Sequence, residues 1–174
     1  LANWEIPGTS FVVQQNGSVD LVYRPPNNPW VHKLLNDCRS LNGRIQTIPK
    51  SKAGTRQLLQ SVRDKHNIGM LIDQKYNEGI PASFLGRPAM TSPAYALLAQ
   101  KFGRPLIPSR IERLGGARFR MTYAPALDMA NKTPEDLVED SHRYLEAWIK
   151  NRPDQWLWLH RRWESAKLRE NENA

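Results

Sequence analysis

Short apolar segments that alternate with amphipathic ones constrain the fold of this chain more than any other feature. Those with the length and pattern of strands are "SVDLVY" (18–23), "RIQTI" (44–48) and "IGMLID" (68–73). The segments between them read as helices: Asn28 and Pro29 suit the start of one, and residues 51–66 form the other. Strands separated by helices favour parallel pairing, because a parallel connection needs a long crossover. The nearly continuous apolar run of "IGMLID" predicts a strand buried on both faces, with Asp73 at its carboxyl end.

The second half of the chain continues the alternation. A short strand is expected to reach Leu85 and turn at Gly86, and a helix to run from Ser92 to Gly103. Two strands, "PLIPSRIE" and "ARFRMTYAP", follow around a glycine turn, and Thr133 caps a last amphipathic helix. We therefore predict an α/β fold with a mixed, mostly parallel central sheet flanked by helices, in a single domain over residues 1–174.

The charge of the chain indicates which classes of partner it is expected to bind. The formal net charge is +8, and residues 101–120 are especially basic. Such a surface favours nucleic acid, anionic lipid headgroups, acidic proteins or phosphorylated substrates, although a basic excess is also common on an ordinary soluble surface. The single cysteine, Cys38, excludes an internal disulfide and a cysteine-rich zinc site. No uncharged apolar run is long enough to cross a bilayer.

Conventional catalytic motifs are mostly missing. There is no Walker loop, dinucleotide-binding glycine pattern, nucleophile elbow or metal-binding pair of histidines. The histidines, none beside an obvious carboxylate in sequence, are His32, His66, His142 and His160. Each is more typical of a surface or packing residue than of a catalytic base.

Several segments that occur in a fixed order are more informative. They are "LVYRPPNNPWVHKLL", "GMLIDQKYNEG", "SFLGRPAMTSPAYALLAQKFGRPLIPSRIER" and "RPDQWLWLHRRW". Together they resemble the lipid A biosynthesis acyltransferases, the late lauroyl and myristoyl transferases of Gram-negative bacteria, within the lysophospholipid-acyltransferase superfamily. The resemblance runs from the first residue to about Trp163, and it implies a glycerolipid acyltransferase-like fold.

The resemblance gives a role to Glu5, which stands among apolar residues in "LANWEIPG". The family motif is a histidine, four arbitrary residues and an acid. Glu5 would be that acid, so the histidine would immediately precede Leu1. The given chain would then lack the general base and is expected to be inactive. A carboxylate at this spacing can orient the imidazole and stabilise its protonated form. The alternative is an incidental charge near the start of the chain.

Other site residues are also implied by the resemblance. An arginine that stabilises the oxyanion would be Arg24 or Arg39, and the sequence does not decide between them. Substrate-binding residues would include Asp73, which alternatively caps a turn, and the segment containing Phe84, Gly86 and Arg87 that contacts the acceptor headgroup. An arginine after a glycine turn suits bidentate contact with phosphate.

Two basic regions are candidates for contact with the membrane or a carrier protein. One contains Arg110 and Arg113, and the other contains Arg161 and Arg162 beside three tryptophans. Aromatic residues next to cations suit a membrane interface, although the tryptophans can equally pack in the core.

The resemblance implies transfer of a fatty acyl chain from acyl carrier protein to a hydroxyl of a phosphorylated lipid A precursor, at the cytoplasmic face of the inner membrane. It implies no metal, no organic cofactor and no nucleic-acid partner. The alternatives are an acyltransferase for another glycolipid or an aminolipid, a basic nucleic-acid-binding module, and a non-catalytic scaffold derived from the same fold.

Overall fold

The computed structural model describes residues 5–158 and 161–163. Contacts divide the chain into two compact units. We call the first, Asn3–Leu71 with Ser109–Tyr123, the sheet unit. The second, Ile72–Pro108 with the residues from Ala124 onward and the first two residues, is the α5 unit. Each unit has its own apolar core. The prediction of one domain stays a prediction.

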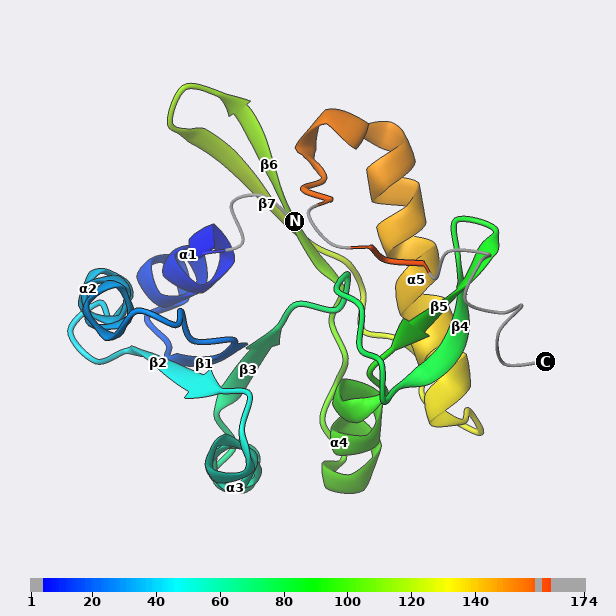
Figure 1. Ribbon diagram of the computed structural model, residues 1–174, viewed down its shortest axis with the longest axis horizontal. Helices are drawn as coiled ribbons and strands as arrows, with labels where there is room; N and C mark the ends of the chain where they lie inside the picture. Colours follow the sequence, from blue (N-terminus) through cyan, green and yellow to red (C-terminus); the bar gives the residue numbers. More distant parts are fainter. Residues whose placement is uncertain (1–4, 159–160, 164–174) are drawn as a thin grey trace. The chain divides into compact units, whose positions relative to one another are not determined.

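A three-stranded parallel sheet forms the centre of the sheet unit (Figure 1). Its middle strand, β1 (Val19–Tyr23), pairs with β2 (Ile45–Pro49) on one side and with β3 (Asn67–Met70) on the other. The two crossovers therefore run in opposite directions across the sheet. Because such crossovers are right-handed, they must place their helices on opposite faces.

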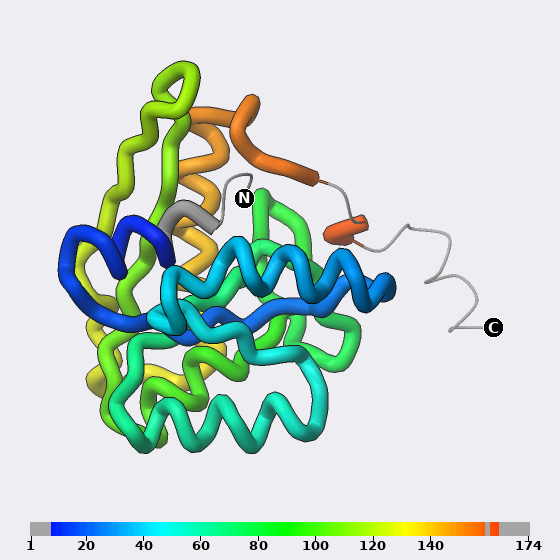
Figure 2. The backbone as a smooth tube through the Cα atoms, turned by 90° about the vertical axis from the view of Figure 1, so that its left-hand side faces the viewer, coloured from blue at the N-terminus to red at the C-terminus, as the bar shows by residue number. Residues whose placement is uncertain are grey.

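The helices of the sheet unit follow this rule. They are α1 (Glu5–Gln15), α2 (Pro29–Arg39) and α3 (Lys52–Arg63). Figures 1 and 2 show α1 and α2 on one face of the sheet and α3 on the other. The core under α1 consists of Val12, Val19, Leu21 and Ile45. A hairpin, β6 (Ser109–Gly115) and β7 (Arg118–Tyr123), contacts α1 through β6.

The α5 unit is built on a second antiparallel hairpin. Its strands are β4 (Ile80–Phe84) and β5 (Arg87–Thr91), joined by Leu85 and Gly86. Both turn residues have positive φ, 51° and 75°, as in the two-residue turns that match the twist of a hairpin. The helices are α4 (Ala94–Phe102), α5 (Pro134–Asn151) and the short 3₁₀ helix η1 (Pro153–Gln155). Strand β4 packs against α5 around Phe84, Leu145 and Ile149.

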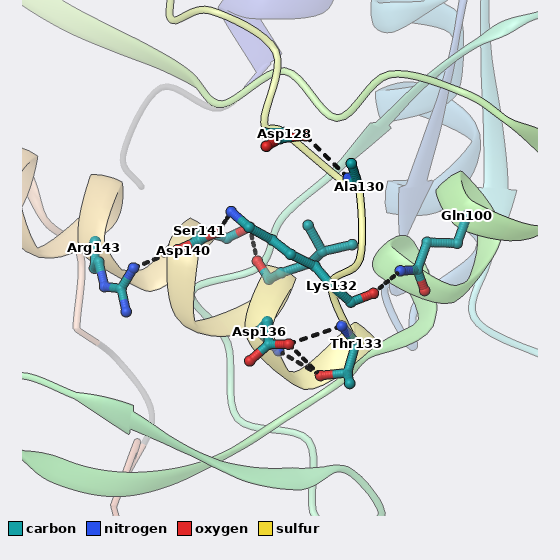
Figure 3. Close-up of polar contacts among 10 residues, drawn as sticks. Gln100, Asp128, Ala130, Lys132, Thr133, Asp136, Asp140, Ser141 and Arg143 are labelled. Carbon is teal, nitrogen blue, oxygen red and sulfur yellow. Dashed lines mark hydrogen bonds and ion pairs between the residues drawn. The ribbon is translucent and has the colours of Figure 1, made fainter.

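The start of α5 is fixed by polar contacts (Figure 3). Thr133 Oγ1 accepts from the backbone N–H of Asp136 at 3.2 Å, and the Asp136 carboxylate accepts from Thr133 N at 2.8 Å. The Thr133 hydroxyl also donates to this carboxylate at 2.8 Å, and the two bonds from Thr133 lower the pKa of Asp136. Gln100 Nε2 donates to Lys132 O at 2.6 Å and ties α4 to this turn. The cap predicted from Thr133 and Pro134 is therefore confirmed.

The mixed α/β fold and its parallel sheet flanked by helices are confirmed. Two local predictions are wrong. Strand β3 is an edge strand that is only half-buried and ends at Met70, so Asp73 lies three residues beyond it and in the other unit. Strand β5, which follows the turn at Gly86, was not predicted. Its Pro88 is tolerated because β5 pairs with β4 alone. In the described residues, no helix has both the length and the apolar character needed to span a bilayer.

We predict that Thr133→Ala destabilises the protein by about 1 kcal/mol, because the substitution removes a side-chain N-cap from the longest helix. Urea denaturation followed by circular dichroism measures the loss. Thr133→Ser keeps the hydroxyl and is the matched control, which we expect to remain near the wild-type stability. Equal stability of the Ala and Ser variants would contradict a capping role.

Candidate active site

The α5 unit contains a cluster of aromatic rings around Phe84, the last residue of β4. Phe84 is fully buried. Trp163 stacks on it at 5.9 Å between centroids, and Trp156 meets it edge-on at the same distance. Trp163 Nε1 also donates to Phe84 O at 3.1 Å. The end of the described chain is thus attached to β4 by stacking and by one hydrogen bond.

Arg162 lies inside this cluster, with only 2% of its surface exposed. Its Nη1 donates to Met90 O and its Nη2 to Thr91 Oγ1, each at 2.6 Å. Its guanidinium lies over the Phe84 ring at 5.1 Å. The prediction that Arg162 contacts a membrane or a carrier is therefore wrong: its side chain is turned inward and braces β5.

Burial lowers the pKa of Arg162, and the negative charge of Asp73 opposes this effect. Asp73 is itself buried. A buried cation is tolerated only when it is hydrogen-bonded and has a countercharge. Asp73 is thus a buried residue of the α5 unit, and its predicted position at the carboxyl end of a strand is wrong.

His142, on α5, completes the buried polar group. Its Nδ1 donates to Ser83 O at 2.7 Å, which leaves Nε2 as an acceptor 3.4 Å from Arg162 Nη2. Burial lowers the pKa of His142, and the nearby positive charge of Arg162 lowers it further. The imidazole is therefore neutral at physiological pH, which agrees with the expectation of a packing histidine.

The three residues in "FLGRP" that were predicted to contact the acceptor headgroup differ in their exposure to solvent. Phe84 lies in the core, so its predicted direct contact with substrate is wrong. Gly86 is exposed in the hairpin turn. Arg87 is exposed at the start of β5, with its guanidinium 5.9 Å from the centre of the Trp163 ring. Of the three residues predicted to contact the headgroup, Arg87 is thus the one with a charged side chain exposed to solvent.

The sheet unit holds the three predicted catalytic residues. Glu5 begins α1, Arg24 directly follows β1 and is exposed, and Arg39 ends α2 and is half-buried. Gly8 packs against Leu21 in β1. At the far end of the helix, Asn16 Oδ1 accepts from Arg44 just before β2. Helix α1 therefore runs antiparallel to β1 and begins toward the carboxyl edge of the sheet.

This direction separates Arg24 from Arg39. Arg24 lies at the carboxyl edge, the edge toward which α1 begins. Arg39 lies at the opposite edge, because the N–H of Ile45, the first residue of β2, donates to Ser40 O at 3.0 Å. Ligands of open α/β sheets collect at the carboxyl ends of the strands. Of the two arginines that the sequence left open, the structure groups Arg24 with the start of α1.

The remaining cations lie in different surroundings. Arg110 pairs with Glu112 at 2.8 Å, and both side chains are largely buried. Arg113 is exposed, lies over Phe119 at 4.7 Å and donates to Gly116 O at 2.6 Å. Arg161 is exposed, in contrast to its neighbour Arg162.

Two histidine contacts in the sheet unit escaped the sequence analysis. His66 Nδ1 lies 3.1 Å from a carboxylate oxygen of Asp20, which is buried in β1 and 46 residues away in sequence. His32 contacts the Tyr23 hydroxyl. Neither spacing is a recognisable motif, since the pairs are formed by the parallel sheet and its crossovers.

The fold is mixed α/β, with a parallel sheet packed against helices and two small hairpins. Residues 1–165 match the model of a family described as bacterial lipid A biosynthesis acyltransferase. The chain belongs to this family, because the match covers nearly all of its 174 residues. Membership implies acyl transfer to a lipid A precursor, and the family is typically associated with the inner membrane. A search among curated proteins finds no match to the chain.

We predict that Arg162→Met destabilises the protein by about 3 kcal/mol, since it removes the guanidinium that donates to Met90 O and Thr91 Oγ1 in the interior. Arg161→Met is the matched control: the neighbouring cation is exposed, so its loss should change stability by no more than about 0.5 kcal/mol. Chemical denaturation of both variants measures the difference. Similar stabilities would show that the Arg162 contacts contribute little.

Proposed function

We propose that the protein transfers a fatty acyl chain from acyl carrier protein to a hydroxyl of a phosphorylated lipid A precursor, at the cytoplasmic face of the inner membrane. The observation that carries the proposal is the family match over residues 1–165. The net charge of +8 supports it, because the carrier is an acidic protein and the acceptor bears phosphates. These two partners account for the basic surface without nucleic acid.

The reaction needs a base for the acceptor hydroxyl and a donor for the oxyanion. We propose that Glu5 orients the histidine expected immediately before Leu1. The imidazole accepts the hydroxyl proton while the oxygen attacks the thioester carbon. The new C–O bond forms, the C–S bond breaks, and the proton passes to the departing thiolate. Arg24, at the same edge as the start of α1, is the better placed of the two arginines to stabilise the oxyanion.

We propose that the residues that bind substrates or partners directly are the arginines whose side chains are exposed. Arg87, backed by Trp163, contacts a phosphate of the acceptor. Arg113 and Arg161 are exposed and are proposed as contacts with the carrier protein or with lipid headgroups. Arg110 is proposed to support the β6–β7 hairpin that carries Arg113 rather than to contact a partner itself, since it forms an ion pair with Glu112.

A competition assay tests the choice of acceptor. The assay uses the protein with the histidine expected immediately before Leu1, which we call the parent enzyme. It is mixed with one acyl carrier thioester and with equal amounts of a phosphorylated lipid A precursor and an aminolipid. We expect the acyl chain on the lipid A precursor. Acylation of the aminolipid alone would overturn the proposed acceptor but not the acyltransferase class.

We predict that Glu5→Ala in the parent enzyme lowers turnover by roughly four decades, as when the orienting acid of a comparable triad loses its carboxylate. Glu139→Ala, which removes an exposed carboxylate from α5, is the control and should keep normal turnover. Circular dichroism establishes that both variants fold. Near-normal turnover of Glu5→Ala would remove Glu5 from the mechanism.

We predict that Arg87→Ala raises KM for the phosphorylated acceptor by roughly thirtyfold, because a charge-assisted bond is worth on the order of 2 kcal/mol. KM for the acyl carrier thioester should change much less. Arg63→Ala removes an exposed cation from α3 and controls for net charge. An equal rise in both KM values for Arg87→Ala would contradict a headgroup contact.

A further inference from the structure

Helix α2 presents a polar face to the sheet. Asn36 Nδ2 donates to His32 Nε2 at 2.8 Å, and Thr47 Oγ1, from β2, donates to Asn36 Oδ1 at 3.1 Å. The hydroxyl of Tyr23, at the end of β1, contacts His32 and donates to Asn36 Oδ1 at 3.4 Å. None of the 11 residues of α2 is buried. Side-chain hydrogen bonds, rather than a buried apolar face, therefore attach this helix to the sheet.

Most apolar side chains of α2 are exposed to solvent instead, and Leu35 is half-buried. Trp30 is 80% exposed, Leu34 is 62% exposed and Val31 is 42% exposed. Cys38 is also exposed. Positions 30, 34 and 38 follow one another at intervals of one helical turn, and Val31 flanks them. We call these four residues the α2 stripe.

This arrangement is the reverse of that in an ordinary surface helix, which turns its apolar stripe toward the core. Contiguous exposed apolar residues mark an interaction site. The charges around the stripe are mainly positive: Lys33 and Arg39 lie on the helix, Arg24 lies upstream, and Asp37 is the single acid of the helix. Asp37 pairs with Lys33 at 2.8 Å.

An apolar stripe with tryptophan and leucine, flanked by cations, is typical of a helix that lies in the interface of an anionic membrane. We propose that α2 is such a helix and that the α2 stripe enters the boundary between headgroups and acyl chains. The inference rests on the proposed function, which brings the protein to a membrane substrate. It adds the element that makes the contact, which lies outside both basic regions expected from the sequence.

The position of α2 suits this role. The helix begins shortly after Arg24, at the carboxyl edge of the parallel sheet. Trp30, which is 80% exposed, lies in its first turn. Membrane contact at this point would bring the edge that holds Arg24, and toward which α1 begins, close to the lipid surface where the acceptor lies.

Cys38 allows a direct test, because it is the single cysteine of the chain and belongs to the α2 stripe. The 174-residue chain is labelled there with the fluorophore NBD and mixed with vesicles of phosphatidylcholine and phosphatidylglycerol. We expect a blue shift of the emission and quenching by nitroxide lipids. The control is Cys38→Ser with Leu97→Cys, which places the label on an exposed position of α4 and should show neither change.

A binding assay supplies the second readout. Trp30→Ser with Leu34→Ser should reduce the vesicle-bound fraction roughly tenfold or more, since the apolar area that would leave water is lost. Leu97→Ser with Ile107→Ser removes two other exposed apolar residues and should bind like the wild type. Absence of vesicle binding, equal losses in both double variants, or a label at Cys38 that stays in water on bound vesicles would each overturn the proposal.

Other occupants of the stripe give different results. A spectral change of the Cys38 label with soluble acyl carrier protein but not with vesicles would assign the stripe to the carrier and overturn membrane contact. A change that depends on protein concentration alone would assign it to a second copy of the chain. In the parent enzyme, transfer to detergent-dispersed acceptor should survive Trp30→Ser with Leu34→Ser, while transfer to vesicle-embedded acceptor should fall. No transfer to dispersed acceptor by the unmodified parent enzyme would instead count against the proposed function.

Discussion

The hydrogen bonds of one buried guanidinium organise the α5 unit. Arg162 reaches the backbone of Met90 and the hydroxyl of Thr91, and these two bonds fix the last described segment against β5. The following residue, Trp163, can therefore stack on Phe84 and lie beside the exposed Arg87. The buried Arg162 thus precedes Trp163 in the chain, and the exposed Arg87 lies 5.9 Å from the centre of the Trp163 ring.

Parallel pairing imposes the corresponding constraint on the sheet unit. Because β2 and β3 lie on opposite sides of β1, their crossovers place α2 and α3 on opposite faces. The same geometry directs the start of α1 and Arg24 toward one edge and Arg39 toward the other. Helix α2 then satisfies the polar groups of Tyr23 and Thr47 with His32 and Asn36. This attachment leaves Trp30, Val31 and Leu34 exposed.

Much of the fold could be predicted from the sequence, because strand and helix signals are local. Asn28, Thr133 and Gly103 mark helix ends through side-chain caps or a left-handed backbone, and all three positions do so in the structure. The burial of Arg162 could not be predicted, since Met90 and Thr91, to which it donates, lie more than seventy residues earlier and the adjacent Arg161 is exposed. The pairing of His66 with Asp20 likewise depends on sheet register rather than on spacing. The edge of the sheet at which Arg24 and Arg39 each lie depends on the direction of α2 relative to the strands, which the sequence does not give.

Product analysis tests the central claim, acyl transfer from a carrier thioester to a lipid A precursor, most directly. The parent enzyme is incubated with a carrier bearing one isotopically labelled acyl chain and with the purified precursor, and both products are followed by mass spectrometry. We expect one labelled acyl ester on the precursor for each carrier that loses its acyl chain. Loss of the acyl chain from the carrier without a labelled ester on the precursor would contradict the claim.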